Sequence, residues 1–137
     1  MKINPYLEFN GHCEAAFRFY EKCLGGKIEM MMKFSETPAE APVPDDWKDK
    51  IMHAALCLGT GDLLMGSDSP PEYQQQPQGF SVSIAIDEPD EAERVFAALA
   101  ENATIKMPMQ ETFWAIRFGM LVDQFGIPWM VNCGRPD

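Results

Sequence analysis

Several short stretches of this chain alternate between apolar and polar residues, and a longer stretch repeats apolar residues at helical spacing. Apolar residues that share one helical face lie between Cys13 and Leu24, and Gly25 follows them as a helix-ending residue. The flanking stretches have the pattern of strands. The first half of the chain is therefore predicted to form one helix and four strands, at residues 3–9, 27–34, 51–58 and 62–66.

The second half repeats this order of elements. Residues 19–30 align with residues 96–107 at an offset of 77, and each segment contains a helix end, a break and a strand that opens Ile-x-Met. Ala92, Val95, Phe96 and Leu99 mark a helix whose capping residues lie at 87–90, with Pro89 near its first turn. Pro108 is predicted to end the strand that follows it. The predicted strands of this half are residues 80–86, 104–107, 114–122 and 127–132.

The repeat predicts an α+β fold of two strand-helix-strand-strand-strand modules. The modules are residues 1–68 and 79–133, joined by a linker at 69–78 within one domain of residues 1–137. A helix covers one face of such a sheet and leaves the other bare, so two modules must pair to cover or share the bare faces. Paired side by side, they would curl into a cup, which is where a ligand would bind.

Two segments carry more detailed expectations. In residues 27–34, strict alternation predicts that Ile28, Met30, Met32 and Phe34 share one face of a half-buried strand. Residues 35–50 are acidic and proline-rich, and they show no period. A loop of that length in a small domain is typical of a functional lid or a flexible excursion.

Composition narrows the classes of function. The 137 residues fit one domain, and the net charge of −10 argues against nucleic acid or an anionic membrane as a partner. No apolar run approaches the roughly 20 residues of a membrane span, and no signal peptide is recognisable. The four cysteines form no Cys-x-x-Cys pair, so we expect reduced thiols and a cytoplasmic protein.

Short sequence motifs in a fixed order carry a family resemblance along the whole chain. They include Glu14-Ala15, Ile51-Met52-His53-Ala54, Phe113-Trp114 and Asp123-x-Phe125-Gly126-x-x-Trp129. With these motifs the chain resembles the vicinal oxygen chelate superfamily, which includes glyoxalase I, bleomycin and fosfomycin resistance proteins and extradiol dioxygenases. Within it, the chain is most similar to the PhnB-like branch.

The resemblance carries expectations about fold and partners. It implies a cupped sheet of the glyoxalase and bleomycin-resistance type, and a homodimer whose cup binds a small molecule. Proteins of the PhnB-like branch are often described as 3-demethylubiquinone methyltransferases. That description finds no support here, because no glycine-rich loop follows a strand and the chain is too short to hold a cofactor-binding fold as well.

Metal-dependent members of the superfamily take His, Gln or Glu ligands from the first and last strand of each copy. Alignment of the strands puts Asn4, Ser81, Met65 and Met130 at these positions. The divalent ions of glyoxalases and dioxygenases prefer imidazole and carboxylate, so we expect neither the superfamily metal site nor a cofactor. Met65 and Met130 are candidate ligand contacts, and core filler is the favoured interpretation.

Three polar residues are candidate ligand contacts, each with a plainer alternative. His53 could act as a base or contact a ligand in the cup, while the favoured interpretation is a half-buried histidine bonded to a backbone carbonyl. Asp68 could accept a ligand donor or serve as a turn residue. Arg117 could point into the cup toward an anionic ligand, or reach the rim and pair with a carboxylate.

Aromatic residues of the second copy form the last candidate set. Trp114 and Trp129, with Phe113 and Phe125, could line the pocket, although such residues in a small sheet protein more often belong to the core. The first functional hypothesis is a metal-independent protein that binds or sequesters a small molecule. The alternatives are a metal-dependent lyase, isomerase or dioxygenase with displaced ligands such as His53 and Glu8, and an interaction module without pocket chemistry.

Overall fold

The chain folds as two units, each with a four-stranded sheet and one helix that covers one face of that sheet. A computed structural model describes residues 1–37, 43–59, 61–70, 72 and 74–135. The first unit is Met1–Gln75 and the second is Gln76–Asp137. Two sheets and two helices confirm the predicted α+β class and the predicted order of elements in each copy.

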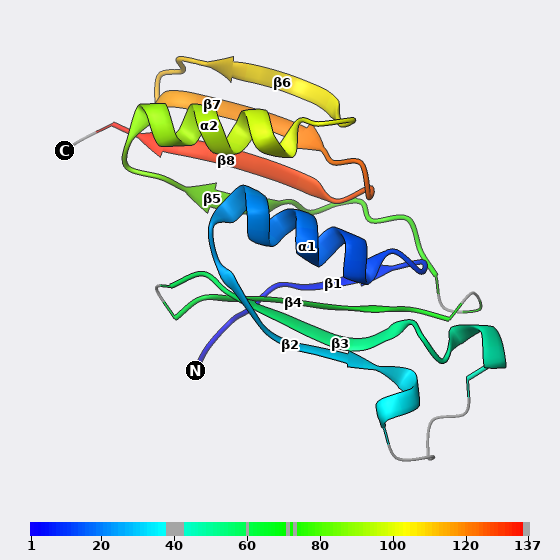
Figure 1. Cartoon of the computed structure of the whole chain (residues 1–137). Helices are drawn as coiled ribbons and strands as arrows, with labels where there is room; N and C mark the ends of the chain where they lie inside the picture. The colour runs from blue at the N-terminus through cyan, green and yellow to red at the C-terminus, as the bar shows by residue number, and fades with distance from the viewer. Residues whose placement is uncertain (38–42, 60, 71, 73, 136–137) are drawn as a thin grey trace. The chain divides into compact units, whose positions relative to one another are not determined.

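The first unit has the sheet order β1-β4-β3-β2, with β1 and β4 parallel and the other pairs antiparallel. Helix α1 packs on β2, β3 and β4. Its elements are β1 (Tyr6–Phe9), α1 (Cys13–Leu24), β2 (Lys27–Lys33), β3 (Ile51–Cys57) and β4 (Leu63–Asp68), as Figure 1 shows.

The second unit repeats the arrangement with the order β5-β8-β7-β6, and β5 and β8 are the parallel pair. Helix α2 packs on β7 and β8 (Figure 1). None of the described helices is long and apolar enough to span a membrane. The elements are β5 (Val82–Ala85), α2 (Pro89–Leu99), β6 (Thr104–Gln110), β7 (Ala115–Val122) and β8 (Pro128–Gly134).

The two sheets share one register. Tyr6 pairs with Met65 in the first sheet, and Ser83 pairs with Met130 in the second. Ser83 follows Tyr6 by 77 positions, whereas Met130 follows Met65 by 65 positions. The offset between equivalent residues of the two units is also 77 at the starts of β2 and β6. At β3 and β7, where Ala55 corresponds to Met120, this offset is 65. The first unit is therefore 12 residues longer (77 − 65 = 12) in the connection between its second and third strands.

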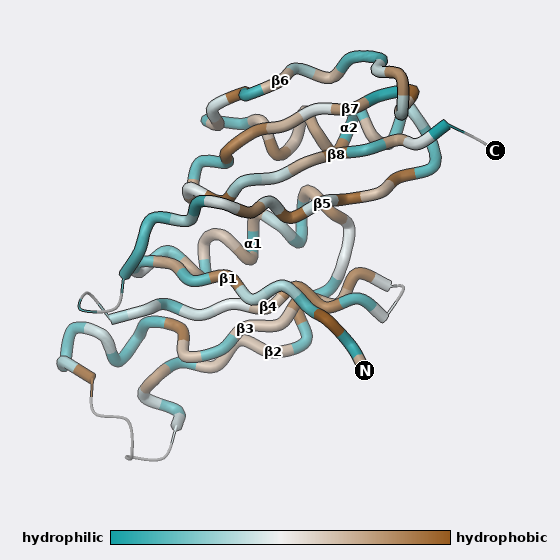
Figure 2. Tube along the Cα trace, turned by 180° about the vertical axis from the view of Figure 1, so that it is seen from behind, coloured by the Kyte–Doolittle hydropathy of each residue, from teal (hydrophilic) through white to brown (hydrophobic). Residues whose placement is uncertain are grey.

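Alternation along the strands separates a helix-covered face from a helix-free face in each unit. Leu7 and Phe9 of β1 are buried and belong to the core that α1 covers, while Tyr6 and Glu8 between them are exposed. Burial alternates in the same way along β4 and β8, and Figure 2 shows hydrophobic and hydrophilic residues mixed along the strands of both units. The apolar half of each strand therefore forms the core with the helix.

Strand β2 corrects the expectation of strict alternation. A register shift lies between Ile28 and Met30, which pair with Leu56 and Ala55. Those two residues are neighbours on β3 and point to opposite faces, so Ile28 and Met30 do not share a face. The extra residue of a β-bulge is not visible in an apolar-polar pattern. Phe34 lies outside the strand, in a short 3-10 turn.

Two predicted strand boundaries and one predicted loop also differ from the structure. Strand β6 continues through Pro108 to Gln110, because β6 is an edge strand and a proline without an N–H is tolerated there. Strand β1 starts at Tyr6 and not at residue 3. The segment predicted as a loop at 35–50 contains a 3-10 turn, Asp45–Trp47, whose tryptophan is buried, and residues 38–42 of it lie outside the described residues.

Candidate functional site

The helix-free face of the first sheet combines methionines with a small set of polar residues. Cross-strand pairing and alternation place two rows of side chains on it. The row through β1, β4, β3 and β2 is Tyr6, Met65, Ala55 and Met30, and the neighbouring row is Glu8, Ser67, His53 and Met32.

Tyr6 and His53 form the one side-chain polar contact that the described residues make across this face. The hydroxyl oxygen of Tyr6 lies 3.2 Å from Nδ1 of His53, and the two groups share a hydrogen bond. The rings stack with centroids 5.7 Å apart and an interplanar angle of 26°. The tyrosine reaches from β1 across β4 to β3, so it links three strands on the helix-free face.

His53 therefore has a tyrosine partner, where the favoured sequence-based interpretation expected a backbone carbonyl. The histidine is half-buried and Tyr6 is 45% exposed. A histidine whose Nδ1 is engaged still presents Nε2 as a donor or acceptor. The pair thus offers a hydrogen-bonding nitrogen and an aromatic ring to a molecule on this face.

Asp68 is the last residue of β4 and pairs with Phe9 of β1. It is only 2% exposed. Its Oδ1 accepts hydrogen bonds from the backbone N–H groups of Gly11 and Cys13, at 2.9 and 3.0 Å. Its Oδ2 accepts one from the N–H of Ile51 at 2.9 Å. The carboxylate therefore ties the start of α1 and the start of β3 to the end of β4.

This carboxylate affects a buried thiol. Cys13, the first residue of α1, is fully buried, and burial raises the pKa of its thiol far above the ordinary value. The negative charges of Asp68 and Glu14 raise that pKa further. The thiol is therefore neutral and unreactive at physiological pH, which fits a core residue.

The helix-free face of the second sheet is more apolar. Met120 pairs with Met130, and Phe118 pairs with Asn132 in the next row. The side-chain oxygen of Asn132 is buried and has no hydrogen-bond partner among the described residues. Trp114 covers Phe118 edge-on, with ring centroids 5.3 Å apart, and is itself 45% exposed.

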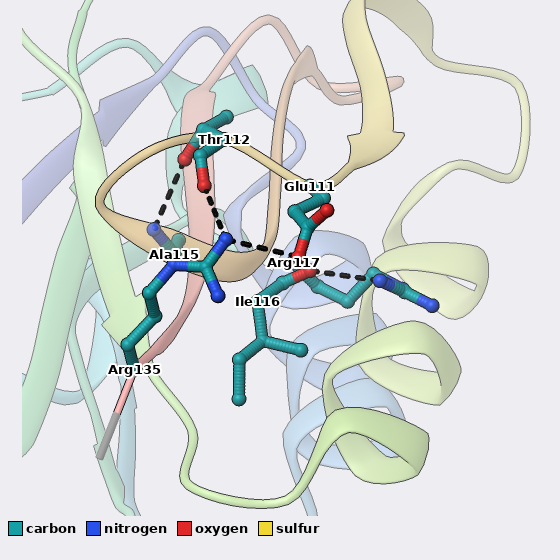
Figure 3. Close-up of polar contacts among 6 residues, drawn as sticks. All are labelled: Glu111, Thr112, Ala115, Ile116, Arg117 and Arg135. Atoms are coloured by element: carbon teal, nitrogen blue, oxygen red, sulfur yellow. Dashed lines mark hydrogen bonds and ion pairs between the residues drawn. The ribbon is translucent and has the colours of Figure 1, made fainter.

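The turn between β6 and β7 holds Trp114 and its neighbour Phe113 in place. The guanidinium of Arg135 donates to the carboxylate of Glu111 and to the backbone oxygen of Thr112, both at 2.9 Å. The hydroxyl of Thr112 accepts from the N–H of Ala115 at 3.1 Å. Figure 3 shows Arg135 between Glu111 and Thr112, and Ala115 beside the hydroxyl of Thr112.

The turn presents two aromatic rings edge to face. Phe113 is 88% exposed, and its ring centroid lies 4.8 Å from that of Trp114 at an angle of 82°. A single exposed apolar side chain needs no explanation, whereas exposed apolar side chains in contact with one another often mark an interaction site. Here the exposed pair continues inward to the buried ring of Phe118.

Arg117 and Trp129 lie on the helix-covered side of the second sheet. The Nε of Arg117 donates to the carboxylate of Glu93 on α2 at 3.1 Å, and its Nη1 donates to the backbone oxygen of Ile116 at 2.8 Å. Trp129 is 1% exposed, and its indole N–H donates to Oδ2 of Asp123 at 2.8 Å. Both side chains therefore have protein partners in this structure.

The residues at the four superfamily metal positions provide no set of hard donors. Asn4 and Ser81 lie just before β1 and β5, and Met65 and Met130 are half-buried on the helix-free faces. Among the described residues no three His, Cys, Asp or Glu side chains gather closely enough to hold a metal ion. Neutral amide, hydroxyl and thioether groups do not fit the divalent ions of this superfamily.

Sequence reasoning missed the partner of His53 and the residue that fixes the aromatic turn. Tyr6 could have been found, because alternation with the apolar Leu7 and Phe9 puts it on the helix-free face. No pattern pointed to Arg135, because its contacts depend on how the end of β8 lies beside the turn. Asp68 and Trp114 were named as candidates, each with its alternative open.

Comparisons with known proteins agree with the fold. YjdN of Escherichia coli (strain K12) is 36% identical to the chain over 140 residues, which cover 96% of this chain and 95% of YjdN. The crystal structure of protein PA1353 from Pseudomonas aeruginosa is 48% identical, with a TM-score of 0.88 and 99% of each chain covered. A PhnB protein from Bacillus cereus, described as a candidate 3-demethylubiquinone-9 3-methyltransferase, is 25% identical, with a TM-score of 0.77 and 98% and 100% of the chains covered.

The family assignment rests on nearly the whole sequence. Residues 2–131 match the family model of the Glyoxalase/Bleomycin resistance protein/Dioxygenase superfamily. The repeated modules, their shared register and the similarity to PhnB all fit that match. The chain therefore belongs to the glyoxalase/bleomycin resistance protein/dioxygenase superfamily.

Proposed function

We propose that this protein binds a small molecule on the helix-free face of its first sheet, without the divalent metal that metal-dependent superfamily members use. The observation that carries the proposal is the contact between Tyr6 and His53. Polar side chains on an otherwise methionine- and alanine-rich sheet face are typical of sites where a few groups orient an apolar ligand.

The surroundings of this pair support binding. Met65 and Met30 lie in the same row as Tyr6, and thioether side chains adapt to differently shaped apolar ligands. Tyr6 is bonded to His53, so little side-chain entropy is lost when a ligand packs against its ring. We propose Tyr6, His53 and Met65 as ligand contacts.

We propose Trp114 and Met130 as ligand contacts in the second unit. Trp114 offers an exposed indole on a turn that Arg135 fixes, and Met130 lies in the neighbouring part of the same helix-free face. Asp68, Arg117 and Trp129 would act behind the binding faces, because each is engaged by protein groups.

A specific observation also favours a second candidate, a metal-dependent lyase or isomerase with displaced ligands. Glu8 and His53 occupy one cross-strand row, so a carboxylate and an imidazole face the same side of the sheet. Elemental analysis of purified protein separates the two candidates. Stoichiometric Zn, Ni, Mn or Fe, together with metal-dependent turnover in glyoxalase or dioxygenase assays, would favour the enzyme.

The binding proposal is tested by a thermal-shift screen of metabolites and drug-like compounds, followed by calorimetry on the strongest hit. Tyr6→Phe removes only the hydroxyl, and His53→Gln replaces the ring. Each should weaken binding about tenfold, as expected for the loss of one to two ordered contacts. His12→Gln is the matched control, because His12 is the other histidine and is exposed before α1.

The outcome that contradicts the proposal is equally concrete. Screening without a hit, or hits whose affinity is the same in Tyr6→Phe, His53→Gln and His12→Gln, would mean that this face binds no small molecule. A protein without a hit would then be better explained as an interaction module.

Two further expectations remain proposals. The resemblance to superfamily members supports a homodimer, which light scattering during gel filtration would detect as a mass of twice 15.4 kDa. All four cysteines are thiols and three are buried, which supports a cytoplasmic location. Cell fractionation that finds the protein outside the cytoplasm would contradict that location.

A further inference from the structure

We propose that the helix-free face of the first sheet selects organic cations, meaning molecules with a ring or apolar body that carries a positive charge. This inference rests on the proposed function and names the chemical class of its ligand. It depends on three properties of the face: an uncompensated carboxylate, an exposed aromatic ring and a thioether surface.

The carboxylate is that of Glu8. Its side chain is exposed on β1, in the row that continues through Ser67 to His53. No described lysine or arginine forms an ion pair with it; the ion pairs of the described residues use other acidic residues. A single unpaired carboxylate beside an apolar surface attracts a cation and repels an anion.

The aromatic ring is that of Tyr6. It stacks on His53 and is held by the hydrogen bond to that ring, while 45% of the residue remains exposed. A cation above the face of a tyrosine gains about 0.5–1 kcal/mol at an exposed site and more when water is excluded. Tyr6 and Glu8 are two residues apart on one strand, so both side chains point to the same side.

The thioethers are those of Met30, Met32 and Met65. They share the rest of the two rows with Ala55 and Ser67, and Met30 is 44% exposed. Polarizable sulfur and methylene groups suit the apolar body of an organic cation, whereas a small hydrated ion gains little from them. The chemistry of the face therefore indicates an amine or onium compound with hydrophobic substituents.

The two lysines of β2 lie at the margins of the face. Lys27 and Lys33 pair with Cys57 and Ile51, at the two ends of β2, and neither belongs to the two central rows. The whole chain carries a net charge of −10, which favours the approach of cations at low ionic strength. An anionic ligand would have to approach Glu8 without a guanidinium or ammonium group in its row.

The experiment compares two probes of nearly the same shape and opposite charge, tetraphenylphosphonium and tetraphenylborate. Calorimetry at about 20 mM salt should give at least tenfold tighter binding of the phosphonium. Amide and side-chain NMR shifts of Tyr6 and His53 should move on its addition. Glu8→Gln should weaken phosphonium binding about three- to tenfold and leave borate binding unchanged or stronger.

The control variant is Glu101→Gln, which changes the net charge equally at an exposed position just after α2. Its phosphonium affinity should stay within about twofold of the wild type. Equal or tighter binding of the borate, or an equal effect of Glu8→Gln and Glu101→Gln, would overturn the inference. The inference would also be overturned if neither the phosphonium nor the borate bound.

The failure of this inference is distinguishable from failure of the proposed function. If neutral or anionic compounds of the screen bind and shift the resonances of Tyr6 and His53, the ligand class is wrong and the binding function stands. If no compound of any charge binds this face, both fail.

Discussion

Buried carboxylates organise both units at the scale of single residues. Asp68 accepts three backbone hydrogen bonds and joins α1, β3 and β4. Asp123 has a similar role in the second unit, where it accepts from Phe125, Ile127 and the indole of Trp129. The sequence analysis named Asp68 as a ligand contact or a turn residue. Its three backbone partners are distant in sequence and could not be predicted from its position after an apolar strand.

Replacement of this carboxylate by an amide should destabilise the first unit. In Asp68→Asn, one oxygen becomes an NH2 group that faces a backbone N–H, so a buried donor loses its acceptor. We expect a loss of about 2–3 kcal/mol in the free energy of unfolding, measured by urea denaturation. Asp49→Asn, at an exposed position, is the matched control. Equal stability of both variants would show that Asp68 does not hold these elements together.

Cys13 should make stability fall in alkaline solution. Its raised folded-state pKa keeps the thiol protonated while the unfolded chain ionises above about pH 8.5, so stability is complete below that pH and declines above it. Cys13→Ala should reduce this decline in thermal melts between pH 8 and pH 10.

Mass spectrometry after alkylation of the native protein at pH 8.5 should find Cys57 modified before Cys13, since Cys57 is half-buried and Cys13 is buried. Early labelling of Cys13 would contradict its burial.

At the scale of elements, each helix packs closely against its sheet over a glycine. A Cβ on Gly66 would lie 2.8 Å from a ring carbon of Phe17 on α1, and one on Gly119 would lie 2.6 Å from a ring carbon of Phe96 on α2. The amphipathic helix patterns predicted these two helices well, because the apolar stripe that packs on a sheet is local in sequence. The close approach over a glycine was not predicted, since it depends on residues in separate elements.

Gly119→Ala should therefore move α2 or weaken its packing. The added methyl would also lie 2.8 Å from the sulfur of Met109, which can rotate away, whereas the ring of Phe96 is part of the core. We expect a loss of about 1–3 kcal/mol in unfolding free energy. Gly134→Ala is the control, because its nearest contact is at an ordinary 3.8 Å. A fully stable Gly119→Ala protein would mean that the helix has room to shift without cost.

Strand prediction was less accurate than helix prediction, for reasons that particular residues show. The bulge after Ile28 and the passage of β6 through Pro108 both depend on the partner strand and on the edge position of each strand. The residues of one strand do not indicate which strand will pair with it or in which register. The site was affected in the same way, because Tyr6 and His53 meet only once β4 lies between their strands.

At the scale of the whole molecule, the duplication was predictable and its chemistry was only partly so. The offset of 77 and the match of Met65 with Met130 correspond to the pairing found in both sheets. The expected absence of the superfamily metal site remains a prediction, based on the identities of Asn4, Ser81, Met65 and Met130.

Metal removal tests that prediction directly. Treatment of the native protein with EDTA, followed by desalting, should leave its thermal midpoint unchanged within about 1 °C, because a ligand that binds only the folded state stabilises it. Adding Zn²⁺, Ni²⁺ or Mn²⁺ at micromolar concentration should likewise leave the thermal midpoint unchanged within about 1 °C. A midpoint that falls on chelation and returns with one of these ions would contradict the prediction and favour the metal-dependent alternative.

The 12-residue difference between the two units has a consequence for how such a protein can change. The extra length falls wholly between β2 and β3, while the strand pairs on both sides of it keep the pairing of the second unit. A connection of different length at that junction therefore leaves the strand pairing unaltered, while in the first unit it adds the buried Trp47 to the core. Natural selection can therefore vary the border of one helix-free face, much as immune receptors vary their loops, while the strand pairing of both units is kept.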